Sequence, residues 1–153
     1  MVIVASFTGC LKSPPVTDPC DYNPCDHPAP EAERQVIKDY LTTNNIAAIE
    51  DCSGVFYTID VQGTGAMPTV CSNIGFQYQG RLLNGTVFET STSPAYSSLY
   101  GLIPGWRAAL PKLKVGGTMT IYIPASLAYG PAGNATIPPN SPLIFRVDLV
   151  AVQ

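Results

Sequence analysis

The sequence predicts an α+β domain in which a five-stranded antiparallel sheet is covered by a short helix. Apolar and polar residues alternate with a period of two over residues 55–61, 74–79, 118–123 and 145–151, a pattern typical of strands that bury one face. In the stretch RLLNGTVFE the pair Asn84-Gly85 separates two apolar arms, which is a strong signal for a β-hairpin. Because each strand has one apolar face, we expect the sheet to be covered on one side.

The covering helix is expected at the only tryptophan of the chain. Trp106, Ala109, Leu110 and Leu113 recur at the spacing of one helix face, so a helix here can lie across the sheet. Pro111 limits the regularity of this helix, because proline lacks the backbone N–H that a helical hydrogen bond requires.

A second helix is expected near the start of the domain. Pro30, Glu31 and Glu33 suit a helix N-terminus, and Asn44-Asn45 can end the helix. Between them lies an apolar stripe at helical spacing, formed by Val36, Ile37, Tyr40 and Leu41. We interpret residues 31–53 as a helix and a connection packed on the main domain, with a dimerisation helix as the alternative.

Composition excludes several classes of function. The 153 residues are 46% hydrophobic and 12% charged, with a formal net charge of −3, which indicates a globular domain and argues against a nucleic-acid partner. The only histidine, His27, lies outside the alternating region, so a Ser-His-Asp arrangement within the domain is excluded. Phosphate-binding, nucleophile-elbow and zinc-protease motifs are absent from the sequence, and we expect neither a cofactor nor a metal.

The first 30 residues differ in character from the rest of the chain. Residues 1–10 contain VIVASFTGC, which resembles the end of a bacterial lipoprotein signal and predicts lipidation of Cys10. A buried first strand ending in a core cysteine is the alternative. Residues 11–30 are rich in proline and turn formers, and we interpret them as a tether or an irregular cap.

Four further cysteines predict disulfides. Beside an export signal, this even number indicates two bridges in an oxidising compartment, and all three connectivities among Cys20, Cys25, Cys52 and Cys71 remain open. A zinc site that includes His27 is the alternative, and the lack of paired CxxC motifs disfavours it.

Aromatic and aliphatic residues gather in the second half of the chain, where each taken singly predicts only core. Read together, four stretches are similar to the FKBP-type peptidyl-prolyl cis-trans isomerases, the immunophilins that bind tacrolimus and rapamycin. They are FQYQGRLLNGTVFETS, GLIPGW, LKVGGTMTIYIPASLAYGPAG and IPPNSPLIFRVDLVAV, in the family's order over residues 54–153. The resemblance implies that this region is an isomerase domain, an FKBP-like α+β fold whose five-stranded sheet wraps on a short helix, here with an N-terminal helix extension.

The resemblance also implies a ligand pocket. Trp106 matches the residue at the floor of that pocket, under the proline ring. Tyr129 matches the tyrosine whose hydroxyl bonds a ligand carbonyl, and the backbone N–H of Ile103 matches a second donor. The remaining matched positions belong to the wall or rim of the pocket: Tyr78, Phe88, Glu89, Leu102, Ile137 and Phe145.

Some positions depart from the family pattern. Glu89 stands where the family usually has Asp, so its carboxylate reaches one methylene further. The loop over residues 90–100 is shorter than in well-known members, and Tyr96 is the candidate for a second pocket aromatic there. Asn134 lies in a region where some members have an aromatic residue or histidine. These departures concern affinity and sequence preference more than fold.

The function implied is a peptidyl-prolyl cis-trans isomerase that accelerates X–Pro bond rotation in exported or periplasmic proteins and so assists folding. The partners implied are proline-containing polypeptides, and tacrolimus- or rapamycin-like macrolides would act as inhibitors. We expect the protein to be a monomer. A proline-peptide-binding or chaperone module with weak or no isomerase activity is the alternative, and a lipid-tethered spacer is disfavoured by the pocket motif. We expect a location in the bacterial cell envelope, lipid-anchored through Cys10 and facing the periplasm or the cell exterior.

Overall fold

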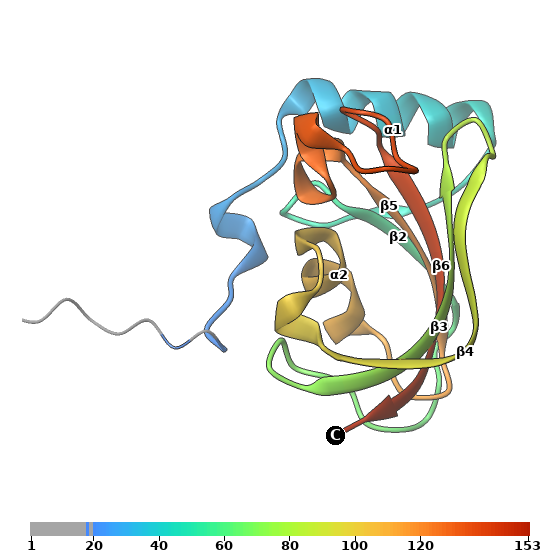
Figure 1. Cartoon of the computed structure of the whole chain (residues 1–153). Helices are drawn as coiled ribbons and strands as arrows, with labels where there is room; N and C mark the ends of the chain where they lie inside the picture. Colours follow the sequence, from blue (N-terminus) through green and yellow to red (C-terminus); the bar gives the residue numbers. More distant parts are fainter. Residues whose placement is uncertain (1–17, 19) are drawn as a thin grey trace, which may run out of the picture.

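Six antiparallel strands form one curved sheet in the computed structural model, which describes residue 18 and residues 20–153 (Figure 1). The expected lipidation site Cys10 lies outside the described residues. The fold class is confirmed, with one strand more than expected, because the two-residue strand β1 is too short for any alternation to reveal. The strands are ordered β1-β2-β5-β6-β3-β4 and span Ile49–Glu50 (β1), Phe56–Val61 (β2), Asn73–Leu82 (β3), Val87–Ser98 (β4), Thr118–Ile123 (β5) and Leu143–Val152 (β6).

The predicted hairpin joins β3 to β4. Gly85 has a φ of +89°, a backbone conformation that favours glycine, and its N–H donates to the carbonyl of Leu82 over 3.0 Å. The side chain of Asn84 accepts from the N–H of Thr86 over 2.9 Å. The Asn-Gly pair therefore sets the turn through a left-handed glycine and a local side-chain hydrogen bond.

Strand β4 continues far beyond the hairpin, which corrects the expectation of a loop over residues 90–100. Its register against β3 shifts between the pairs Tyr78–Ser91 and Phe76–Ala95, so residues 92–94 oppose Gln77 alone. The side-chain amide of Gln77 donates to the carbonyl of Thr92 within this bulge. A serine- and threonine-rich segment of this kind has no clean alternation, and the bulge interrupts what alternation there is.

The concave face of the sheet holds the main core. Helix α2 (Pro104–Ala109) lies inside the curve of the sheet (Figure 1) and passes into a 3-10 helix, Leu110–Lys112. The expected stripe is confirmed, because Trp106, Ala109, Leu110 and Leu113 are each no more than 4% exposed. Pro111 lies in the 3-10 segment, where the regular α-helix has already ended.

The convex face is also partly covered, which corrects the expectation of cover on one side. Helix α1 (Glu31–Thr43) buries Ile37 and Leu41 against Phe56, Tyr122 and Ile144 from β2, β5 and β6. Phe56 and Tyr122 occupy positions that the alternation assigned to the outer face, and Ile144 directly precedes the alternating run 145–151. The predicted packing of this helix on the domain is therefore confirmed, and it ends as expected before Asn44 and Asn45, the latter with a φ of +53°.

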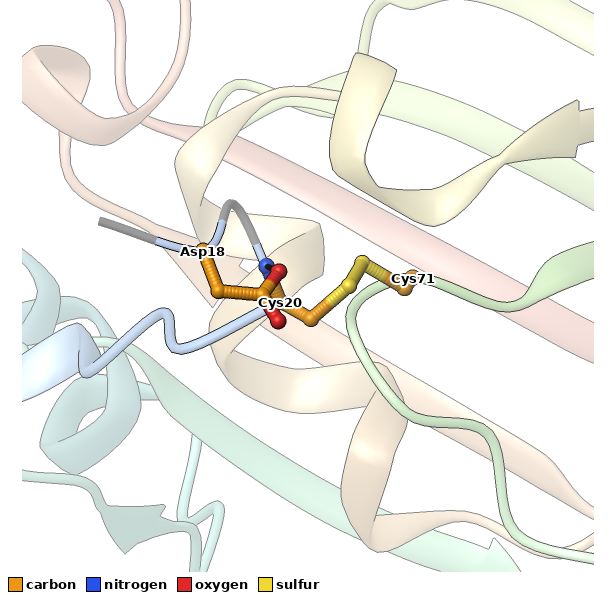
Figure 2. A group of neighbouring side chains, drawn as sticks. All are labelled: Asp18, Cys20 and Cys71. Atoms are coloured by element: carbon orange, nitrogen blue, oxygen red, sulfur yellow. Dashed lines mark hydrogen bonds between the residues drawn. A yellow bond between two sulfur atoms is a disulfide. The ribbon is translucent and has the colours of Figure 1, made fainter. Parts of the chain in front are cut away.

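Two disulfides attach the segment before α1 to the domain. Cys20 pairs with Cys71, and Cys25 pairs with Cys52. Figure 2 shows the first bridge beside Asp18, whose carboxylate accepts from the N–H of Cys20 over 2.9 Å. Because both cysteines nearest His27 are consumed in bridges to different partners, the zinc alternative is wrong. Residues 20–30 are thus fastened to the domain and form an irregular cap, which we call the cap.

Four short 3-10 helices complete the structure: Pro24–Asp26 (η1), Leu99–Gly101 (η2), Ala125–Leu127 (η4) and Gly130–Ala132 (η5). In the part of the chain that the structure describes, none of the helices combines the length and apolar character needed to cross a membrane.

Candidate functional site

A pocket of about 110 Å³ opens on the concave side of the sheet, where strands β3, β4 and β6 face α2 and the segments beside it. It is lined mainly by aromatic and aliphatic side chains, as is usual for ligand pockets. Its lining residues are Phe76, Tyr78, Glu89, Leu102, Ile103, Trp106, Tyr129 and Phe145.

Trp106 is the centre of this pocket. Its ring meets Phe76, Tyr78 and Phe145 edge to face, with centroids 5.0, 5.5 and 5.3 Å apart, the arrangement that aromatic quadrupoles prefer. The side chain is 4% exposed and belongs to the main core. Its indole N–H is buried and has no acceptor among the described residues. Trp106 therefore serves as core on one side and as pocket lining on the other.

Phe88 packs against a pocket residue and is not itself among the lining residues, contrary to expectation. Its ring meets Phe145 edge to face, with centroids 5.6 Å apart. The space for this ring exists because position 80 is glycine: a Cβ on Gly80 would lie 2.5 Å from Phe88 and 2.8 Å from Phe145. Phe88 thus fixes the position of Phe145, a residue that does line the pocket.

Tyr78, Tyr129 and Glu89 supply polar side-chain groups to the pocket. Burial of its hydroxyl raises the pKa of Tyr78 well above the ordinary value, and the nearby Glu89 carboxylate raises it further. Burial and Glu89 also raise the pKa of Tyr129. Since the protonated form is favoured in each case, both hydroxyls remain hydrogen-bond donors at neutral pH.

Ile103, the predicted backbone donor, is among the residues that line the pocket. Ile103 directly precedes α2, and its carbonyl accepts from the N–H groups of Trp106 and Arg107. Within residues 20–153, its own N–H has no hydrogen-bond partner. Ile103 lines the pocket, and its N–H remains the predicted ligand donor.

Two further predicted residues lie outside the pocket lining. Ile137 is 2% exposed and belongs to the core, not to the pocket rim. Tyr96 is 62% exposed and lies over Gly75, where a Cβ would come within 2.6 Å of its ring. Asn134 also has a structural task, because its side-chain oxygen accepts from the N–H groups of Thr136 and Ile137 over 2.9 and 2.8 Å.

Phe76 is the pocket aromatic that sequence reasoning missed. It precedes Tyr78 by two residues on β3, so the two side chains share one face of the strand. That spacing is the signal that could have found it, since a pocket residue at position 78 makes position 76 a candidate. The alternation alone indicated a core residue, and Phe76 is indeed 4% exposed.

Comparisons with known proteins agree with this geometry. The family model for FKBP-type peptidyl-prolyl cis-trans isomerases matches residues 65–150. The chain is 41% identical over 105 residues to a peptidyl-prolyl cis-trans isomerase named Mip from Coxiella burnetii, covering 66% of this chain and 46% of the relative. It is 40% identical over 104 residues to an FKBP-type 22 kDa isomerase from Escherichia coli, covering 65% and 50%. The chain thus spans about half the length of the curated relatives it matches.

Solved structures show the same fold. The crystal structure of FkpA from Escherichia coli superposes with a TM-score of 0.73 at 33% identity, over 80% of this chain and 59% of that one. A peptidyl-prolyl cis-trans isomerase from Pseudomonas syringae superposes with a TM-score of 0.71 at 32% identity, over 82% and 97%. With the family model matching more than half of its length, the chain belongs to the FKBP-type peptidyl-prolyl cis-trans isomerase family.

Proposed function

We propose that this chain catalyses cis–trans rotation about X–Pro bonds in polypeptides. The observation that carries the proposal is the pocket itself, an apolar cavity centred on Trp106 and walled by Phe76, Tyr78 and Phe145. A proline ring can rest on the indole, while the rest of the peptide leaves through the open side. Tacrolimus- and rapamycin-like macrolides are expected to compete for the same cavity.

The mechanism follows from the electronic structure of the amide. Rotation must overcome a barrier of roughly 20 kcal/mol, which makes the uncatalysed step take tens of seconds. Planarity comes from resonance that separates charge, so an apolar pocket disfavours the planar form relative to the twisted one. The N–H of Ile103 and the hydroxyl of Tyr129 can hold the peptide during the turn. Catalysis then consists of binding the twisted state more tightly than either planar state.

A matched pair of tyrosine variants tests this proposal. Tyr129→Phe removes one donor from the pocket, whereas Tyr96→Phe removes a hydroxyl from an exposed ring outside it. In a coupled assay on a short X–Pro peptide, we expect Tyr129→Phe to lower kcat/KM about 3- to 10-fold, the equivalent of one hydrogen bond, and Tyr96→Phe to match wild type. Equal effects of the two changes, or a wild-type protein with no turnover, would contradict the proposal.

A binding or chaperone role with weak turnover is the second candidate. It is favoured by Glu89, which lines the pocket beside Tyr78 with a side chain one methylene longer than aspartate. This role predicts that Tyr129→Phe still protects an unfolding client from aggregation as well as wild type does. Proportional loss of protection and turnover would reject it.

We also propose that the protein works as a monomer in the bacterial cell envelope, anchored by lipid on Cys10. Two disulfides favour an oxidising compartment, and one relative, from Legionella longbeachae, is named an outer membrane protein. Labelling of bacterial cells with palmitate tests the anchor: a label that persists in the Cys10→Ala variant would refute it.

A further inference from the structure

A second groove lies beside the pocket, where the cap meets α2 and η4. Its volume is about 620 Å³, and its lining includes Tyr22, His27, Pro104, Arg107 and Leu127. Neither the family resemblance nor the pocket chemistry assigns a use to it.

Arg107 is the distinctive group in this groove. The centre of its guanidinium lies 4.8 Å from the ring centroid of Tyr22 and 5.6 Å from that of Tyr100, so two aromatic rings hold the cation. Its Nε is buried without a hydrogen-bond partner. Within the described part of the chain, no carboxylate forms an ion pair with it.

Two acidic side chains near this groove have hydrogen-bond partners other than Arg107. Asp26 lines the groove, but its carboxylate accepts from the side-chain amide of Asn23 over 2.8 Å. Glu33 of α1 accepts from the N–H and hydroxyl of Ser126 over 2.9 and 2.8 Å. Arg107 is therefore a positioned cation whose planar guanidinium can take a carboxylate from outside the chain.

Two chain segments contribute residues to both the pocket and the groove. Ile103 lines the pocket and its neighbour Pro104 lines the groove, while Tyr129 and Leu127 stand in the same relation two residues apart. A polypeptide with its proline on Trp106 can thus extend into the groove. Resting on the proposed isomerase function, we propose that this groove is an extended subsite, in which Arg107 binds an acidic side chain of the client close to the isomerised proline.

The cap is what builds this subsite. Tyr22 lies between Cys20 and Cys25, each of which is bonded to the domain. The short helix η1 that follows Tyr22 buries none of its residues, and the bridges on either side of Tyr22 help to keep its ring over the guanidinium. Acid preference should therefore depend on both Tyr22 and Arg107.

The test is a set of peptide pairs carrying Glu or Gln at each of the three positions before and after the proline. At one of these positions we expect wild type to turn over the Glu peptide about two- to five-fold more efficiently than its Gln partner, which is the effect of an exposed ion pair. Arg107→Gln should bring this Glu/Gln ratio to one, and Tyr22→Ala should lower it. Arg146→Gln is the matched control, because it removes a positive charge from an exposed position on β6 that lines neither the pocket nor the groove, and it should keep the ratio.

Turnover of the Gln peptides separates this proposal from the proposed function. If they are turned over but no peptide position shows a Glu preference, or if the preference survives Arg107→Gln, the proposed subsite is refuted while the proposed isomerase function is retained. If no peptide is turned over, titration calorimetry with the same pairs still decides the subsite: Glu peptides that bind more tightly to wild type than to Arg107→Gln support it, and equal affinities refute it.

Discussion

Removing the bridge between Cys20 and Cys71 should destabilise the domain without changing its pocket. This bridge closes a separation of 51 residues, and the bridge between Cys25 and Cys52 closes 27 residues inside it. With the inner bridge intact, the outer one closes a path of only about 24 residues, from Cys20 to Cys25 and from Cys52 to Cys71. The chain-entropy relation then gives a loss of about 3.5 kcal/mol in the free energy of unfolding for the double alanine variant.

The same relation fixes the effect of losing both bridges. Their joint removal should cost about 7 kcal/mol, because each bridge shortens the loop that the other closes. A domain of ordinary stability, about 5–15 kcal/mol, would then be marginal or unfolded. The variant that lacks only the bridge between Cys20 and Cys71 is therefore the informative one. The variant that lacks both bridges sets the upper limit of the loss in stability.

Urea denaturation followed by tryptophan fluorescence provides the assay. Trp106 is the only tryptophan and is 4% exposed, so its emission reports the main core. Turnover of a neutral X–Pro peptide is measured in parallel and should stay at the wild-type value. A loss of stability below about 1 kcal/mol would refute the reasoning, because the bridge would then not be restricting the unfolded chain. A parallel loss of turnover would show that the bridge acts through the pocket.

Two further predictions concern titration and a buried charge. Burial raises the folded-state pKa of Tyr78 and Tyr129 above the unfolded value near 10. Their contribution to stability is therefore complete below pH 10 and is lost as the pH rises above it. Denaturation at pH 9 and pH 11 should show a lower free energy of unfolding at the higher pH, and the decrease should be smaller in Tyr129→Phe. Burial alone would raise the pKa of Asp51, but hydrogen bonds from Lys112 and Ser53 hold it below the ordinary value, so this carboxylate stabilises the fold above about pH 4 and less as the pH falls further. Lys112→Met removes the ammonium group that lies 2.8 Å from the Asp51 carboxylate, which is 7% exposed, and should lower the free energy of unfolding by about 1.5–3 kcal/mol at neutral pH. We expect the double variant Asp51→Asn/Lys112→Met to be no less stable than either single variant. Additive losses would contradict the pairing.

Sequence pattern predicted those parts of the fold that depend on local periodicity. The strands, the turn at Gly85 and the helical stripe through Trp106 each occupy one short segment, so the pattern carries the necessary information. The cover on the convex face escaped prediction because Phe56, Tyr122 and Ile144 lie on three separate strands. Only their assembly into a sheet places them together under α1.

The sequence predicted those pocket residues whose position follows from the spacing within one strand or helix. Tyr78, Trp106 and Phe145 were placed correctly in the pocket. Tyr96 was not, because it pairs with Gly75 and so lies on the opposite face of the sheet from Phe76 and Tyr78, and the sequence does not reveal this register. The pairing of the cysteines was likewise beyond the sequence, since all three connectivities satisfied the same spacing.

The glycine at position 80 has a consequence for how pockets of this kind diverge. Phe88 can pack against Phe145 as it does only because β3 carries no methyl group at that point. An alanine there would force one or both rings to shift and so change the shape of the pocket that Phe145 lines, although every lining side chain would stay the same. The ligand size that the pocket accepts thus depends partly on a residue that does not line it. Related chains with identical pocket aromatics can therefore differ in the ligands that they bind.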